Sequence, residues 1–173
     1  MTVPMRTVIV GAGLSGLIAG RTLVDAGHDV VLLDKGRSPG GRLATRRVGA
    51  ARLDHGAQFF TVRSDVFGAM VAAWERDQLV YEWCRGFTPH GDGFPRYVAT
   101  GGMNALAKQL AAGMDVRCES LVFAVRPGAG EWAVGLDDGT AIAADALVVT
   151  CPLPQAFAVL VASGVEVPEA LRT

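Results

Sequence analysis

The chain has 173 residues, half of them apolar, and a formal net charge of −1 at pH 7. This composition is typical of a soluble globular protein, and it gives no reason to expect a nucleic acid or an acidic membrane surface as a partner. The three cysteines show no CxxC or Cys/His spacing, so neither a disulfide framework nor a zinc site is indicated, and we expect no metal. A reducing, cytoplasmic location fits best.

The first elements are a strand, a helix and a second strand. Thr7 to Val10 is a continuous β-branched run that ends at a glycine, which predicts a buried strand of a parallel sheet. A helix is expected from Leu14, with Gly27 just past its end, and Val30 to Leu33 is the second buried strand. Connections this short predict a right-handed βαβ unit.

Two further helices are expected in the middle of the chain. Ser64 is the predicted N-cap of the first, because apolar residues follow it at helical spacing. The second lies between Thr100 and Gly113. The segment from Arg85 to Tyr97 contains several glycines and prolines, so we expect a loop there.

Strands and a final helix are predicted in the last third. The expected strands are roughly Val116–Val125, Glu131–Leu136 and Ala141–Thr150. The apolar stretch Ala146–Val161 is interrupted by Pro152, Pro154 and Gln155, so it is not expected to span a membrane. From Pro152 the chain begins a helix and then enters a Pro-containing tail that closes no recognisable unit.

A glycine-rich fingerprint lies where the first strand ends and the helix begins. Gly11 permits a tight turn, Gly13 lets the backbone approach a pyrophosphate, and Gly16 lets the helix pack close to the strand. The positive end of the helix then faces the phosphates. The residues expected to form this site are Gly11, Ala12, Gly13, Leu14, Ser15 and Gly16.

Asp34 follows the second strand, where an acceptor is needed for the ribose hydroxyls of adenosine. A 2′-phosphate would be repelled there. Lys35 and Arg37 can alternatively be interpreted as an NADP phosphate site. Beside Asp34 we interpret them as solvated or as facing the pyrophosphate, and Lys35 is included among the cofactor residues.

A second glycine pair, Gly40-Gly41-Arg42, follows closely, and a simple NAD domain has no evident need for it. This pattern resembles the GG motif of the FAD-dependent amine oxidase superfamily. Together with the segments GGRLATRR, DHGAQFFTVR and YVATGGMNAL, it is most similar to the renalase-like branch. The resemblance extends over nearly the whole chain, although the acidic residue after the second strand is more often glutamate in the family.

The resemblance implies FAD as the cofactor and extends the set of cofactor residues. Gly40 and Gly41 are implied to lie along the dinucleotide, with Arg42 near the phosphates. The segment Leu53 to Phe60 resembles the strand beneath the isoalloxazine ring, and Val122 matches a valine whose backbone contacts adenine. The remaining residues implied are His55, Gly56, Ala57, Gln58 and, at a strand end near the cofactor, Thr150.

The resemblance also implies the domain organisation. We expect an α/β, Rossmann-like FAD-binding domain, with a parallel sheet and a β-meander crossover, over residues 1–62 and 98–152. Residues 63–97 and 153–173 are expected to be incomplete, partly helical segments of a substrate domain. Because family members are longer, the chain is expected to be their N-terminal half.

The expected activity is FAD-dependent oxidation of a hydride donor, either a dihydronicotinamide or an amine, with oxygen as the acceptor. No catalytic side chain is assigned, and Cys151 is interpreted as a buried, inert thiol. The aromatic residues Trp74, Tyr81, Trp83 and Phe94 are more typical of a core than of a substrate wall. Two alternatives stay open: an NAD(P)-binding Rossmann reductase or sensor, and an inactive truncated FAD-binding fragment. The sequence makes no prediction of oligomeric state.

Overall fold

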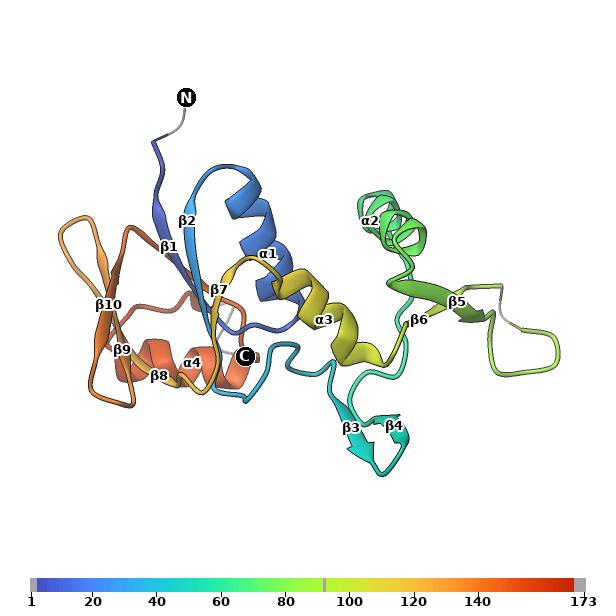
Figure 1. Cartoon of the computed structure of the whole chain (residues 1–173). Helices are drawn as coiled ribbons and strands as arrows, with labels where there is room; N and C mark the ends of the chain where they lie inside the picture. The colour runs from blue at the N-terminus through green and yellow to red at the C-terminus, as the bar shows by residue number, and fades with distance from the viewer. Residues whose placement is uncertain (1–2, 92, 170–173) are drawn as a thin grey trace. The chain divides into compact units, whose positions relative to one another are not determined.

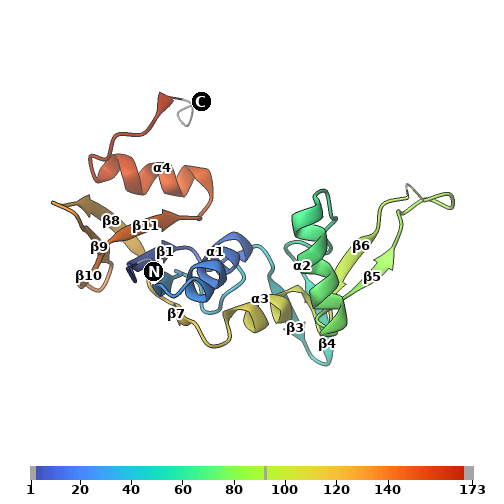
Figure 2. The ribbon, with the colours of Figure 1, turned by 90° about the horizontal axis from the view of Figure 1, so that it is seen from above.

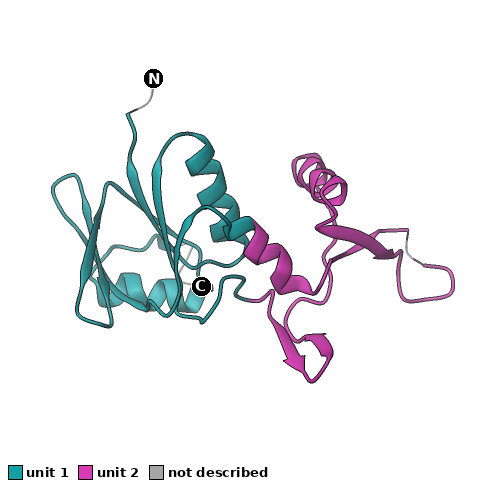
Figure 3. Ribbon diagram, viewed as in Figure 1, with its two compact units in different colours: residues 1–41, 110–173 teal, residues 42–109 magenta. Residues whose placement is uncertain are grey.

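The computed structural model describes residues 3–91 and 93–169, which divide into two compact units. Unit 1 comprises residues 1–41 and 110–173, and unit 2 comprises residues 42–109 (Figure 3). The functional domains expected from the sequence have their boundaries at residues 62 and 98 instead, and that division stays a prediction.

A parallel sheet of four strands lies at the centre of unit 1. In spatial order its strands are β11 (Ala146–Val149), β1 (Arg6–Val10), β2 (Asp29–Leu33) and β7 (Asp115–Arg117). The strands β1, β2 and β7 are labelled in Figure 1, and β11 is labelled in Figure 2. Apart from their first residues, β1 and β2 are buried on both faces, which explains why their sequences are continuously apolar. The helix α1 (Leu14–Asp25) connects these two strands. The predicted Rossmann-like α/β fold is confirmed.

The end of α1 follows the prediction made for Gly27. This residue has φ +87°, and its N–H donates to the carbonyl oxygen of Val24 at 2.9 Å. The N–H of His28 donates to the carbonyl oxygen of Leu23 at 3.0 Å. These two bonds form a Schellman motif, which needs a residue that adopts a left-handed conformation without strain.

An antiparallel meander packs against the parallel sheet within unit 1. Its strands are β8 (Val122–Pro127), β9 (Trp132–Leu136) and β10 (Ala141–Ala144). One face of β1 and β2 shares a buried core with β8 and β9, to which Val8, Leu33, Val125 and Val134 contribute. The helix α4 (Leu153–Ala162) packs against β8 (Figure 2).

The strand predicted over Val116–Val125 is two strands in different sheets. Between β7 and β8, Glu119 has φ +53° and its N–H donates to the carbonyl oxygen of Gly36 at 2.8 Å. The N–H of Ser120 donates to the carbonyl oxygen of Asp34 at 2.9 Å. These bonds hold the segment beside the end of β2, and the left-handed turn at Glu119 then directs the chain into the meander. Apolar periodicity alone gives no signal for this change.

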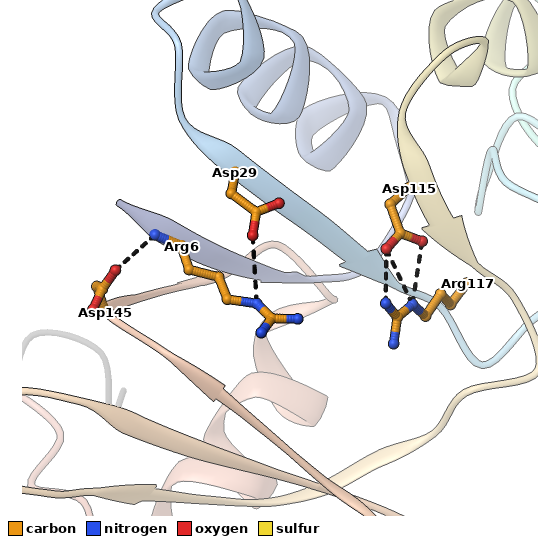
Figure 4. A network of polar contacts seen from close by, with 5 residues as sticks. All are labelled: Arg6, Asp29, Asp115, Arg117 and Asp145. Atoms are coloured by element: carbon orange, nitrogen blue, oxygen red, sulfur yellow. Dashed lines mark hydrogen bonds and ion pairs between the residues drawn. The ribbon is translucent and has the colours of Figure 1, made fainter. Parts of the chain in front are cut away.

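The strand predicted over Ala141–Thr150 is divided in the same way, at Asp145. The N–H of Arg6 donates to the Asp145 carboxylate at 2.7 Å (Figure 4). In return, the N–H of Asp145 donates to the carbonyl oxygen of Arg6 at 2.8 Å. Before this point β10 pairs antiparallel with β9, and after it β11 pairs parallel with β1. The reciprocal bonds fix the place where the chain changes sheets.

Unit 2 contains two helices and two antiparallel strand pairs. The elements are β3 (Thr45–Val48) with β4 (Ala51–Asp54), α2 (Asp65–Arg76), β5 (Val80–Cys84) with β6 (Arg96–Ala99), and α3 (Met103–Ala111), of which the residues up to Gln109 belong to this unit. The predicted N-cap is confirmed, because the Ser64 hydroxyl accepts from the N–H of Phe67 at 3.3 Å.

The prediction of a loop from Arg85 to Tyr97 is wrong at its end, because β6 begins at Arg96. The strand β5 was not predicted. Residues 63–97 therefore contain strand as well as helix.

None of the described helices combines the length and the apolar character needed to cross a membrane. Within residues 3–91 and 93–169, no group of His, Cys, Asp and Glu is arranged to hold a metal ion.

Candidate functional site

The glycine loop joins β1 to α1, and its three glycines have different surroundings. Gly11 has φ +105°, and its N–H donates to the carbonyl oxygen of Leu33 at 2.8 Å. A Cβ at Gly16 would overlap the carbonyl oxygen of Gly11, so glycine at this position permits the close packing of α1. A Cβ at Gly13 would meet no heavy atom within 4 Å. The space beside Gly13 is therefore open to an approaching ligand.

The N-terminus of α1 has no side-chain cap. Its N-cap residue is Gly13, and its first turn carries no acidic side chain. Ala12 is buried, Leu14 is half-buried and Ser15 is exposed. Helix N-termini present amide groups without intrahelical partners and a partial positive charge, so this end of α1 favours an anion.

Asp34 lies beside the loop, and both of its carboxylate oxygens accept hydrogen bonds from the backbone. Oδ2 accepts from the N–H of Ala12 and Oδ1 accepts from the N–H of Gly36, each at 2.7 Å. The sequence predicted a ribose acceptor here and did not predict these bonds. An ionised carboxylate has about four acceptor positions, so two of them remain. The adjacent Lys35 is exposed.

The second glycine pair lies against the first fingerprint within unit 1. The N–H of Gly40 donates to the carbonyl oxygen of Ala12 at 2.8 Å, and Gly13 and Gly40 form an isolated parallel bridge. Gly41 has φ +52°, and a Cβ there would lie 3.4 Å from the Cα of Gly13. Glycine is therefore favoured at 41 both for its backbone conformation and for this close approach. Two motifs that are separate in the sequence form one backbone cluster.

Thr150, at the end of β11, is tied to the same loop. Its hydroxyl donates to the carbonyl oxygens of Gly11 at 2.9 Å and of Val10 at 3.1 Å. The next residue, Cys151, is half-buried, and burial raises the pKa of its thiol. Burial likewise raises the pKa of Cys118, the residue after β7. Neither thiol has the lowered pKa that activates a nucleophilic cysteine.

Val122 lies in the second strand after α3. The first strand after α3 is β7, and Val122 begins the next one, β8, where its side chain is buried. Its backbone contact with adenine stays a prediction.

The remaining predicted residues lie in unit 2. The N–H of His55 donates to the carbonyl oxygen of Ala44 at 3.0 Å, and that of Ala57 donates to the carbonyl oxygen of Arg42 at 2.8 Å. A Cβ at Gly56 would overlap the carbonyl oxygen of Arg42, so glycine permits this close approach. Arg42, His55 and Gln58 are exposed. The segment is irregular, since β4 ends at Asp54, and the single strand expected over Leu53–Phe60 is not observed.

The aromatic residues of unit 2 divide into packed and exposed members. Phe60 contacts Phe67, Trp74 and Tyr97, with ring centroids 5.7–6.3 Å apart. Trp74 is buried, as expected for a core residue, and burial raises the pKa of Tyr97. The expectation of a core position is wrong for Tyr81, Trp83 and Phe94, which are exposed, and Phe87 is exposed as well.

Two polar residues of unit 2 were missed by the sequence reasoning. Thr45 and Asp54 are directly paired across β3 and β4, and their side chains bind each other and the first amides of α3. Their positions beside Arg42–Ala44 and before His55 are visible in the sequence, but the long-range contact with α3 is not.

Two family models match parts of the chain. Residues 9–76 match the NAD(P)-binding Rossmann-like domain, and residues 62–172 match the flavin containing amine oxidoreductases. The second match covers well over half of the chain. The chain belongs to the flavin-containing amine oxidoreductase family. This assignment supports FAD as the cofactor and an FAD-dependent oxidoreductase as the enzyme class.

Curated relatives of this family member include oxidases and a desaturase. Polyamine oxidase 1 of Oryza sativa subsp. japonica is 35% identical over 132 residues, which cover 71% of this chain and 25% of that protein. Hydroxyneurosporene desaturase of Rubrivivax gelatinosus is 42% identical over 76 residues, which cover 42% of this chain and 14% of the desaturase. The chain thus spans a quarter or less of the length of these relatives.

Solved structures of other proteins share the fold of this flavin-containing amine oxidoreductase. An engineered triple mutant of putrescine oxidase aligns with a TM-score of 0.75 at 14% identity, covering 98% of this chain and 62% of that one. A CLA-producing fatty acid isomerase from P. acnes aligns with a TM-score of 0.72 at 14% identity, covering 99% and 63%. At this identity the likeness shows the fold alone, and the renalase-like branch stays a prediction.

Proposed function

We propose that this chain provides the FAD-binding part of an oxidoreductase that takes a hydride from a small-molecule donor and passes the electrons to oxygen. The observation that carries the proposal is the backbone cluster of the two glycine motifs. Gly40 is hydrogen-bonded to Ala12 and bridged to Gly13 beside the uncapped N-terminus of α1. A Rossmann domain that uses only the first fingerprint has no need of this second segment.

The residues of unit 1 fit the adenosine and pyrophosphate parts of FAD. The pyrophosphate is assigned to the N-terminus of α1, where Gly13 leaves open space and the amides have no side-chain acceptor. The adenosine ribose is assigned to Asp34, whose carboxylate keeps acceptor capacity after its two backbone bonds. The exposed Lys35 supplies positive charge for the phosphates. The hydrogen bond from Thr150 to Gly11 stabilises the conformation of the glycine loop.

The residues of unit 2 are assigned to the flavin side. Flavin, when bound, supplies the hydride-accepting ring. The backbone of Gly56 and Ala57 is assigned to the ring, because the segment is held close to Arg42 by hydrogen bonds and lacks bulky side chains at these two positions. Arg42 is assigned to the phosphates. No side chain is assigned as a nucleophile.

The donor is proposed to be an amine or a dihydronicotinamide. The family description and the names of the polyamine and putrescine oxidases favour an amine. The GGRLATRR and DHGAQFFTVR segments favour a renalase-like, dihydronicotinamide-type donor through the resemblance described above.

A second candidate function is an NAD(P)-binding Rossmann reductase or sensor. The match of residues 9–76 to the NAD(P)-binding Rossmann-like domain favours it. Exposed Lys35 and Arg37 are available for a 2′-phosphate, but the negative charge of Asp34 opposes one. The two candidates therefore differ in the ligand that binds most tightly.

Equilibrium titration of the purified chain with FAD, NAD and NADP separates them. We expect FAD to bind most tightly, with a change in the visible flavin spectrum. Tight NAD(P) binding without measurable FAD affinity would overturn the proposal.

Gly13→Ser provides a sharp variant for the same titration. Serine is a good N-cap, so the fold should be retained, but its hydroxyl takes the helix amides and its Cβ fills the open space. The FAD dissociation constant should rise at least about tenfold, equal to about 1.4 kcal/mol. Gly68→Ala in α2, where a Cβ would only touch Val62 at 3.4 Å, is the matched control and should leave FAD affinity unchanged.

A further inference from the structure

The N-terminus of α3 is capped by the β3–β4 hairpin instead of by its own sequence. The Asp54 carboxylate oxygen Oδ1 accepts hydrogen bonds from the Thr45 hydroxyl and from the N–H of Met103, the latter at 3.0 Å. The Thr45 oxygen in turn accepts from the N–H of Asn104 at 3.0 Å. Two amides of the first turn are thereby satisfied by a pair of side chains from more than forty residues away along the chain.

The sequence before α3 explains why the capping side chains come from the hairpin. Gly101 and Gly102 precede the helix, have φ values of +83° and +100°, and offer no side chain as an acceptor. A Cβ at Gly102 would lie 2.8 Å from Cγ2 of Thr45, so the glycine lets the hairpin approach. The Arg52 guanidinium donates to the carbonyl oxygen of Gly101 at 3.0 Å and adds a third contact.

The two capping residues are the immediate chain neighbours of two segments that are proposed to contact the cofactor. Thr45 follows Arg42–Ala44, and Asp54 precedes His55–Ala57. These two segments are joined by the bonds from His55 to Ala44 and from Ala57 to Arg42. A displacement of the Thr45–Asp54 pair would therefore be transmitted to both segments through the main chain.

We propose that Thr45 and Asp54 are positioning residues that fix Arg42–Ala44 and His55–Ala57 against the first turn of α3. They act on the cofactor environment through the backbone and do not touch the ring themselves. The inference rests on the proposed function, because it takes both segments to contact bound FAD. It assigns a role to the T-x₈-D spacing of the hairpin and to the Gly101-Gly102 pair before α3.

The test compares disruptive with conservative variants of the full chain. Asp54→Ala removes the acceptor and Thr45→Val removes the hydroxyl, whereas Asp54→Asn keeps an acceptor oxygen and Thr45→Ser keeps the hydroxyl. Asp138→Ala is the matched control: it also removes an Asp–Thr contact, since Asp138 accepts from the N–H and hydroxyl of Thr140, but it lies in the turn between β9 and β10.

Hydrogen exchange tests the capping bonds, and circular dichroism of bound flavin tests the positioning role. In the chain without added FAD, hydrogen exchange at the amides of Met103 and Asn104 should be roughly tenfold faster in the disruptive variants, the factor expected for the loss of one or two hydrogen bonds. At saturating FAD, the visible circular dichroism of the bound flavin should change in these variants. The conservative variants and the control should resemble the wild type in both measurements.

Each arm has its own contradicting result. Unchanged exchange at both amides in Asp54→Ala would overturn the cap, and an unchanged flavin spectrum despite faster exchange would overturn the positioning role. Failure of the conservative variants to restore the wild-type spectrum would also overturn it. If the wild-type chain bound no FAD, the proposed function would be wrong and the positioning role would be lost with it, while the exchange data would still report on the cap.

Discussion

Replacement of Gly16 by alanine should weaken the contact between α1 and the end of β1. The added methyl group would overlap the carbonyl oxygen of Gly11 and lie 2.8 Å from the Thr150 hydroxyl. Neither atom is the free end of a flexible chain. The carbonyl belongs to the backbone, and the hydroxyl is held by bonds to Gly11 and Val10. The helix must therefore move away from the sheet.

The size of the effect follows from two opposing terms. Overpacking a well-packed site costs about 1–3 kcal/mol, and we take the upper end because the overlap is with backbone. Alanine in place of glycine stabilises a helix by about 1 kcal/mol. The free energy of unfolding of Gly16→Ala, measured by urea denaturation followed by circular dichroism, should therefore fall by about 2 kcal/mol. Gly68→Ala gains the same helix propensity without the overlap, so it should be at least as stable as the wild type. Equal stability of Gly16→Ala and wild type would refute the reasoning.

Three further predictions concern unit 1. Thr150→Val removes the donor to the Gly11 carbonyl and should lower the free energy of unfolding by about 1 kcal/mol, whereas Thr150→Ser should not; equal losses in both would contradict a role for the hydroxyl. Cys151 should react with iodoacetamide more slowly than a free thiol at pH 8, with an apparent pKa above the ordinary value, as measured by site-resolved mass spectrometry; faster reaction would show an activated thiolate. The hydrogen bond from Arg117 lowers the pKa of Asp115, so its stabilisation is present above the unfolded-state pKa and is lost as pH falls through the folded-state value (Figure 4). The pair is half exposed, so Asp115→Asn should reduce stability at pH 7 by no more than about 1 kcal/mol, and a difference from wild type that persisted at pH 2 would contradict this cause.

The βαβ unit was predictable because its signals are local. A β-branched run, a glycine turn and a glycine at the helix end each specify the backbone within a few residues. The structure confirms β1, α1 and β2, and it confirms Gly27 in its left-handed conformation. The prediction of Ser64 as the N-cap of α2 was correct for the same reason, because a capping signal is also local.

The changes of sheet were not predictable because long-range hydrogen bonds decide them. Asp145 separates β10 from β11 through bonds to Arg6, which lies at the other end of the chain. Glu119 separates β7 from β8 in a left-handed conformation that glutamate rarely adopts. Apolar residues continue on both sides of each break, so the periodicity of the sequence predicts one continuous strand where the structure has two. The pair β5–β6 was missed because the prolines and glycines between the strands dominated the local signal.

Part of the candidate site followed from motif order, and part did not. The sequence placed Gly13 and Gly40 in a dinucleotide site, and the structure brings their backbones together. It gave no sign that Thr45 and Asp54 cap α3, because that contact depends on the register of the β3–β4 hairpin. A hydrogen-bonded cross-strand pair is visible only once the partner strand is known.

Asp34 shows how a motif residue can have a structural role beside its expected ligand role. Asn at this position keeps one acceptor oxygen but places an NH₂ group against either the Ala12 or the Gly36 amide, so one backbone bond is lost. Asp34→Asn should therefore be less stable by about 1 kcal/mol or more even without FAD, as measured by urea denaturation. Unchanged stability would show that the two backbone bonds contribute little. The FAD dissociation constant of the folded variant should rise as well, and if it did not, Asp34 would shape the glycine loop without binding the ribose. Because the carboxylate that is expected to bind the ribose also holds the amide of Ala12, the loop and the ribose site depend on one side chain.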